Sequence, residues 1–142
     1  MPDLELHDHQ SVLALDLDAL LRAATEALPL VLAQPGPHES VLAALETVEV
    51  SFISDAQIAA AHAQFLGDPA PTDVITFQHG EILISTDTAQ RQAAEHGTDP
   101  PRECALYLIH GLLHLHGHDD HVPSEAAAMC ELQEEILRAV WH

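Results

Sequence analysis

The sequence contains no lysine, and its 142 residues include only four arginines against 23 aspartates and glutamates, for a formal net charge of −19. A surface with this charge repels phosphate backbones, so broad electrostatic binding of nucleic acid is disfavoured. No apolar run reaches the ~18–20 residues that a membrane span needs. The start, Met-Pro-Asp-Leu-Glu, lacks the positively charged region of a signal peptide, so we expect a cytoplasmic protein with no membrane partner.

Cysteine and glycine are also scarce. The two cysteines, Cys104 and Cys130, lie far apart and form no CxxC pair, which predicts buried reduced thiols rather than a disulfide or a zinc clip. The six glycines form no phosphate-binding loop, so no nucleotide cofactor is expected. The hydrophobic content of 47% is sufficient for a core. We therefore expect one domain over residues 1–142, and a disordered chain is excluded.

The pattern of apolar residues predicts strands and helices along the whole chain. The expected strands are a short one around Leu4 and Leu6, then 47–53, 74–77 and 81–85, with the last two paired. The expected helices are one from Asp16 that Pro29 perturbs at its end, one from Ser54 or Asp55 to about Leu66, then 87–96, 102–116, and 124–140 with Ser124 as its cap. This mixture predicts an α+β fold with one small mixed sheet covered by helices.

Five of the 12 histidines fall between His110 and His121. His110 and His114 are four residues apart on a predicted helix, so their rings share one face and can converge on a metal ion. Gly117 allows the chain to reverse, which brings Asp120 back towards the rings. The segment H-x-x-x-H-x-x-G-x-x-D thus predicts a three-ligand metal site on a central helix, most suited to one zinc ion per chain with an open fourth position.

Two simpler interpretations stand beside this one. An isolated H-x-x-x-H is usually incidental, and a histidine-rich tract can bind metal adventitiously at a surface. The pair lies in the most apolar helix of the chain, where an imidazole needs a partner for its nitrogen, and this favours a real site. Metalloproteases of the H-E-x-x-H type carry Glu after the first His, and Gly111 occupies that position. A protease is therefore disfavoured.

At these residues the sequence resembles the YbeY family of metal-dependent endoribonucleases of bacterial ribosomal RNA maturation. The family signature H-G-x-L-H-L-x-G-[YF]-D-H is matched at seven positions. Two further segments are similar to the family's P-T-D-V-L-S-F and G-D-I-x-I. The matching residues are His110, Gly111, Leu113, His114, Leu115, Gly117 and Asp119 in the signature, Pro71 to Phe77 in the second segment, and Gly80 to Ile84 in the third.

The resemblance implies an α+β fold, one zinc ion held by three side chains of the signature, and partners among ribosomal RNA and ribosome assembly proteins. The family's third ligand is a histidine, whereas the aligned residue here is Asp120, followed by His121. We expect Asp120 as the third ligand because the register after Gly117 places it there. The family's Asn, aromatic residue and RNA-engaging Arg on the preceding helix fall on His62, Phe65 and Leu66.

Three functions remain open at this point. The first is a single-strand-specific, metal-dependent endoribonuclease of small-subunit ribosomal RNA maturation and ribosome quality control, with no catalytic side chain assigned. The second is a metal-holding binding module of ribosome assembly with weak or lost nuclease activity. The third is a metallohydrolase of another small substrate. Two further residues have expected roles: Asp73 as a turn residue rather than a second site carboxylate, and Ser85 as a helix cap rather than a nucleophile.

The histidines outside the ligand set differ in their sequence neighbourhoods. We expect solvated rings at five polar or terminal positions. For His116 and His118, which flank the ligand set, the sequence leaves open whether they support the ligands or lie on the surface. The histidines expected to be solvated are His7, His9, His38, His96 and His142.

Overall fold

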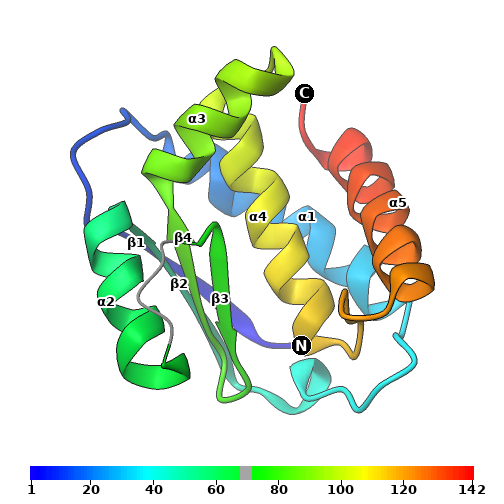
Figure 1. Cartoon of the computed structure of the whole chain (residues 1–142). Helices are drawn as coiled ribbons and strands as arrows, with labels where there is room; N and C mark the ends of the chain where they lie inside the picture. Colours follow the sequence, from blue (N-terminus) through cyan, green and yellow to red (C-terminus); the bar gives the residue numbers. More distant parts are fainter. Residues whose placement is uncertain (68–71) are drawn as a thin grey trace.

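The computed structural model describes residues 1–67 and 72–142, apart from the side chain of Leu66, and arranges them as helices around one sheet (Figure 1). The interpretations placed on Leu66 and Pro71 therefore lie outside the described residues. In chain order the elements are β1 (Asp3–Asp8), α1 (Leu17–Leu32), the short 3₁₀ helix η1 (Leu42–Ala44), β2 (Thr47–Ile53), α2 (Asp55–Leu66), β3 (Val74–Phe77), β4 (Glu81–Ser85), α3 (Thr86–His96), α4 (Pro100–Leu115) and α5 (Pro123–Val140).

The four described strands form one mixed sheet in the order β1-β2-β4-β3. β1, β2 and β4 run parallel, and β3 pairs antiparallel with β4 as the short link between them predicts. Val48, Val50 and Phe52 alternate along β2 and are fully buried on one face, in the same core as α1, α4 and α5. The α+β prediction with a single mixed sheet is confirmed.

The opposite face of the sheet carries a second, smaller apolar cluster. Ile53 and Ile75 from the sheet pack there with Ile58 of α2. Ser54 caps α2 through a complete capping box with Gln57, and Gly67 ends the helix with a φ of +74°. The predicted N-terminal cap of α2 is therefore confirmed.

Helix α4 is the central element, because it packs against α1, α3, α5 and the strands β3 and β4. Gly111 lies at its closest approach to the sheet. A Cβ added at Gly111 would meet Ile82 Cδ1 at 2.8 Å and Ile82 Cγ2 at 2.9 Å. The absence of a side chain at this position therefore sets how deeply α4 seats on β4.

Three of the helix boundaries that differ from the predictions lie at prolines. Pro29 stays inside α1: it is exposed, while Leu28 and Val31 beside it are buried and hold the last turn against the core. Pro100 begins α4 two residues earlier than expected, since a proline at the first helical position loses no needed hydrogen bond. For the same reason α5 begins at Pro123, so Ser124 lies inside the helix and is not its cap.

The cysteines form no disulfide. Cys104 is buried in α4, and burial raises the pKa of its thiol to about 12. Cys130 is exposed on α5, so the prediction of a buried thiol is wrong there, because it lies on the solvent side of an amphipathic helix. Among the helices that the structure describes, none has the length and apolarity to cross a membrane.

The contact between Gly111 and Ile82 generates a stability prediction. Gly111→Ala is expected to lower the free energy of unfolding by about 1–3 kcal/mol, because the new methyl group overpacks the contact. Ile82→Val alone should cost about 0.5–1.5 kcal/mol. The double variant should be somewhat more stable than the sum of the two costs implies, since valine lacks Cδ1, the nearest of the contacting atoms, while the Cγ atoms at 2.9 and 3.2 Å remain. Urea denaturation of the four proteins measures this, and strictly additive costs would contradict the packing argument.

Candidate metal centre

His110 and His114 lie one turn apart near the end of α4, with their side chains about a fifth exposed. Their Nε2 atoms are 3.0 Å apart. The ring planes are nearly perpendicular, at 81° with centroids 4.6 Å apart. The helical spacing thus brings the two rings together as the sequence predicts.

Each ring is oriented by a hydrogen bond at Nδ1, the nitrogen that does not face the other ring. His114 Nδ1 lies 3.1 Å from the backbone carbonyl oxygen of His118, and His110 Nδ1 lies 2.7 Å from Gln133 Oε1 on α5. A carbonyl oxygen only accepts hydrogen bonds, so both Nδ1 atoms carry the proton. In the neutral rings both Nε2 lone pairs then face the same point. This arrangement is the one by which proteins prepare imidazoles for a cation.

Asp120 returns to the rings after the chain reverses at Gly117. Its Oδ2 is 3.6 Å from His110 Nε2, and its Oδ1 is 3.8 Å from His114 Nε2. The three side chains offer ligand atoms that all lie within 4.8 Å of one another. Asp120 is the most exposed of the three, at 43%, so the site opens on its side. Two neutral imidazoles and a carboxylate with an open side fit a divalent cation such as zinc.

A strap formed by residues 36–41 holds this reversal in place. Gly36 N donates to the carbonyl oxygen of His116, and His38 N donates to that of Gly117. Gly117 has a φ of +90°, and a Cβ there would lie 2.4 Å from His38 O. Gly117 is therefore required both by its backbone conformation and by the strap. The His38 ring lies 3.0 Å from Glu125 Oε1, and this hydrogen bond raises the pKa of His38.

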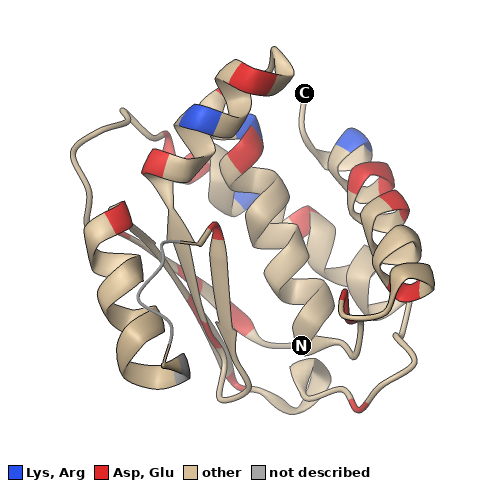
Figure 2. Cartoon of the chain, viewed as in Figure 1, with Lys and Arg blue, Asp and Glu red and all other residues tan. Residues whose placement is uncertain are grey.

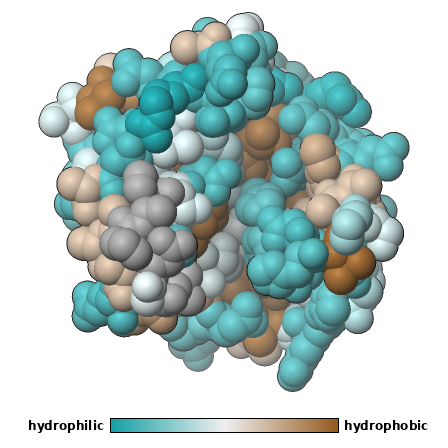
Figure 3. Space-filling view, viewed as in Figure 1, coloured by the Kyte–Doolittle hydropathy of each residue, from teal (hydrophilic) through white to brown (hydrophobic). Residues whose placement is uncertain are grey.

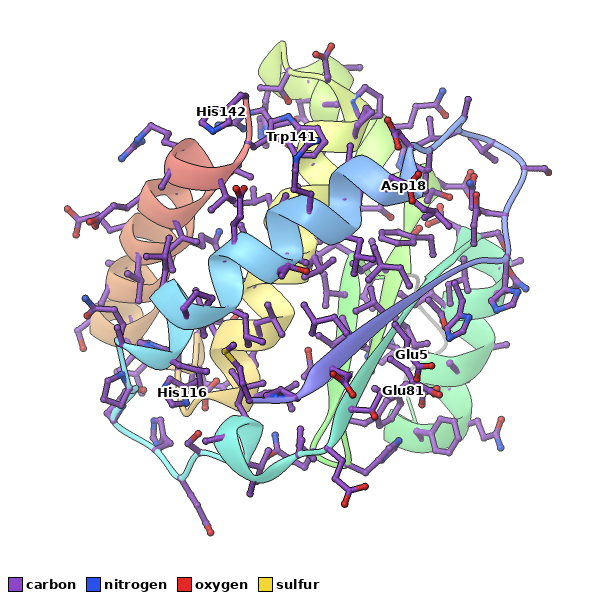
Figure 4. All side chains as sticks on the ribbon, turned by 180° about the vertical axis from the view of Figure 1, so that it is seen from behind. Glu5, Asp18, Glu81, His116, Trp141 and His142 are labelled. Atoms are coloured by element: carbon purple, nitrogen blue, oxygen red, sulfur yellow. The ribbon has the colours of Figure 1, made fainter. Side chains whose placement is uncertain are left out.

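The other histidines of the cluster have different positions. His121 is 86% exposed and lies 3.6 Å from Asp119; it groups with Asp119 and Asp120 but not with His110 and His114. His116 is buried: its Nδ1 is 2.7 Å from Ser40 Oγ and its Nε2 is 3.0 Å from Leu32 O, so it holds the strap and α1 together (Figure 4). His118 supports the site through its carbonyl oxygen, while its ring lies 2.6 Å from Gln34 O.

Burial is the main influence on His114. It lowers the pKa of the ring, and the nearby His110 lowers it further, while Asp120 opposes the shift. The pKa of Asp119 is also lowered: desolvation raises it, but the hydrogen bond from the backbone N–H of Asp120 and the nearby His121 outweigh that effect. His114 is thus held as a neutral donor near neutral pH, and Asp119 as an anion beside the loop.

The three side chains line one end of a cavity of about 450 Å³, here called the metal cavity, whose opposite wall is formed by Asp73, Val74 and Thr76. Asp73 Oδ1 accepts a hydrogen bond from Val74 N at 2.8 Å, which confirms its turn role and also places it on this wall. Among the residues that the structure describes, Thr76 Oγ1 is a buried polar atom with no hydrogen-bond partner. Such atoms occur where water or a ligand completes the bonding.

Several contributors to the site carry no signal in the sequence. Gln133, His38 and Gly36 are distant from the histidine cluster along the chain, and no motif marks them. Ser85 caps α3 by accepting from Thr88 N, as predicted. His7, His9, His96 and His142 are exposed, as expected, whereas the exposed His38 is bound to Glu125.

Comparison with known proteins gives consistent matches. A family model described as endoribonuclease YbeY matches residues 5–140. The chain is 35% identical over 143 aligned positions to endoribonuclease YbeY of Pelotomaculum thermopropionicum, with 90% of each protein covered. It is 32% identical over 139 positions to endoribonuclease YbeY of Cutibacterium acnes, covering 86% of this chain and 84% of that protein. A solution structure of a Thermotoga maritima protein has the same fold, with a TM-score of 0.62 at 24% identity over 97% of this chain and 89% of that one.

Asp120 and His121 can be separated by metal titration. Asp120→Ala is expected to weaken zinc binding by more than about 100-fold, since it removes a donor 3.6 Å from His110 Nε2. The matched variant, His121→Ala, should change the affinity by less than about threefold, because its ring faces solvent. Calorimetric titration of both variants against the parent measures this. A loss confined to His121→Ala would show that the third donor is misassigned.

The pH dependence of metal content follows from His114. A ligand ring must be neutral, and protons compete for it only below its pKa, which lies below 6.5. Bound zinc should therefore persist at pH 7 and be lost as the pH falls below 6.5. Without metal, the folded chain binds fewer protons at His114 than the unfolded chain, so its stability should fall over the same range. Elemental analysis after dialysis at a series of pH values measures the loss; release beginning above pH 7 would contradict the assignment.

Proposed function

The chain belongs to the endoribonuclease YbeY family, and on that basis we propose that it is a metal-dependent endoribonuclease acting on single-stranded ribosomal RNA. Family membership supports an endoribonuclease role. We also propose that it acts in small-subunit maturation and ribosome quality control, in the cytoplasm and together with ribosome assembly proteins. We propose that residues 1–142 form one metal-binding domain.

The observation that carries the proposal is the pair of Nε2 atoms 3.0 Å apart with both Nδ1 atoms bound to carbonyl oxygens. Two lone pairs at this distance repel each other unless a proton or a metal cation lies between them, and with both Nδ1 atoms protonated a metal cation satisfies both neutral rings at once. We propose that His110, His114 and Asp120 hold one zinc ion per chain. When bound, such an ion polarises a phosphodiester oxygen or lowers the pKa of a bound water towards ~7.

The chain's own residues shape what can reach the site. Gln133 and the carbonyl oxygen of His118 hold the two rings in the tautomer that leaves Nε2 available. Gly111 packs on Ile82 at the position where a protease would carry its general base, which argues against peptide hydrolysis. The opposite wall offers the Asp73 carboxylate and the Thr76 hydroxyl, so a strand laid in the metal cavity meets polar groups on both sides.

A second function is favoured by the net charge of −19. A metal-holding binding module of ribosome assembly would need the same three ligands and the same strap, but no electrostatic attraction for free RNA. Such a module would differ from the nuclease only in that it binds RNA without cleaving it. The family's RNA-engaging Arg falls on Leu66, whose side chain lies outside the described residues.

Cleavage of a labelled single-stranded fragment of ribosomal RNA separates the two functions. The parent should cut it in the presence of zinc and stop on addition of a chelator. His110→Ala should cut at least about 100-fold more slowly, because the ion is not retained. His7→Ala is the matched control, since His7 is exposed on β1, and it should cut like the parent. Equal cleavage by His110→Ala would mean that a contaminating nuclease cuts the RNA. No cleavage by the parent would favour the binding-module function.

A further inference from the structure

Beside the metal cavity lies a larger cavity of about 640 Å³ enclosed by α3, α4 and α5. We call it the arginine chamber. Its lining includes Thr88, Arg91, Gln92, Arg102, Tyr107 and Glu134. Thr72 and Asp73 line both cavities, and Gln133, which orients His110, also lines the chamber. The two cavities therefore adjoin each other at Thr72 and Asp73 and are together called the groove, and Figure 3 shows this face of the molecule hollowed along its middle.

The chamber holds an unusual share of the positive charge. The chain has four arginines and no lysine, and Arg91 and Arg102 both line this one cavity, together with the carboxylates of Asp73, Glu103 and Glu134. Figure 2 shows the basic positions in the upper half of the view, on α3, α4, the end of α5 and α1, which lies behind α4, whereas acidic positions are spread widely. Arginine pairs with phosphate through two parallel hydrogen bonds. In so acidic a protein, this is the part of the groove best suited to a phosphate.

The two arginines are held differently. Arg91 Nη1 lies 2.6 Å from Asp55 Oδ2, and its Nη2 contacts Thr88, so it is a fixed charge. Arg102 Nη2 is 3.3 Å from Glu134 Oε2, and both side chains are about one third exposed. An ion pair of this length and exposure is worth at most about 1 kcal/mol. Arg102 can therefore exchange Glu134 for a phosphate at little cost.

The distance between the arginine chamber and the metal ligands suits a single strand. Arg102 and His110 are eight residues apart on α4, which is about 12 Å along the helix axis. At ~3.4 Å for each stacked nucleotide, this corresponds to roughly three to four nucleotides. A strand whose cleaved phosphodiester lies at the metal ligands would thus pass one of its other phosphates through the chamber.

We infer that the arginine chamber is a phosphate-binding subsite for single-stranded RNA, in which Arg102 binds a phosphate about three to four nucleotides from the cleaved bond and Glu134 competes with that phosphate. The inference rests on the proposed endoribonuclease function. It accounts for RNA binding by a chain of net charge −19 without an arginine at position 66. It also predicts that charge changes at Arg102 and Glu134 alter RNA binding more than the same changes elsewhere on the surface, which general electrostatics does not.

The test measures binding of a fluorescent oligouridylate of about twelve nucleotides to the metal-loaded protein at low temperature. Fluorescence anisotropy gives the affinity, and a denaturing gel verifies that the strand remains intact. Arg102→Gln should weaken binding about tenfold. The slope of log K against log salt should become shallower by about 0.7, as expected for one lost phosphate contact on a single strand. Glu134→Gln should bind at least as tightly as the parent, and more tightly at low salt.

Two controls carry the same charge changes outside the chamber. Arg22 on α1 and Glu131 on α5 are exposed, so Arg22→Gln and Glu131→Gln should shift the affinity by less than about twofold. Equal weakening by Arg22→Gln and Arg102→Gln would overturn the subsite, as would weaker binding by Glu134→Gln. If Arg102→Gln binds like the parent while His110→Ala still loses cleavage, the subsite fails and the nuclease function stands. If the parent does not bind the strand, both fail.

Discussion

The seating of α4 on the sheet is the contact on which the rest of the molecule depends. This helix is buried along most of its length, and it approaches β4 closely because Gly111 leaves Ile82 in direct contact with its backbone. Next to that contact, His110 and His114 lie on the exposed edge of the helix. A buried helix cannot rotate without exposing its apolar face, so the directions of His110 and His114 are set by the core rather than by each other.

The second constraint is charge. A net charge of −19 disfavours an RNA site, and part of that charge lies away from the cavities, although Asp73, Glu103 and Glu134 line the arginine chamber. Glu5, Glu49 and Glu81 form a row of cross-strand neighbours on the sheet face opposite α4, where Figure 4 shows Glu5 and Glu81 near each other. Like charges placed this way are mildly destabilising. They lie away from the groove, while two of the four arginines line it.

Much of this could be predicted from periodicity and spacing. Alternation along Thr47–Ile53 predicts β2 with its bounds, and the i, i+4 histidines with Gly117 predict a convergent set. The register after Gly117 predicts that Asp120, not His121, approaches the rings. The departures lie mainly at prolines, at Cys130, where position within a helix decides the outcome, and at His38, which is exposed but bound to Glu125. Gln133, the strap at residues 36–41 and the arginine chamber could not be predicted, because each depends on which distant segments the fold brings together.

The position of Gly111 also limits the chemistry that the metal ligands can support. Metal-assisted hydrolysis on an H-x-x-x-H helix usually takes its general base from the residue after the first histidine, on the same helix. Here that residue faces Ile82 and has no room for a side chain. Other carboxylates line the cavity, those of Glu39, Asp73 and Asp119, and of these Asp73, anchored through Oδ1 to Val74 N, would place a proton acceptor next to β3. The separation between ligands and acceptor is then set by the packing of α4 against β3 and β4, so the contact that seats the helix also sets the width of the cavity in which a phosphodiester would be cut.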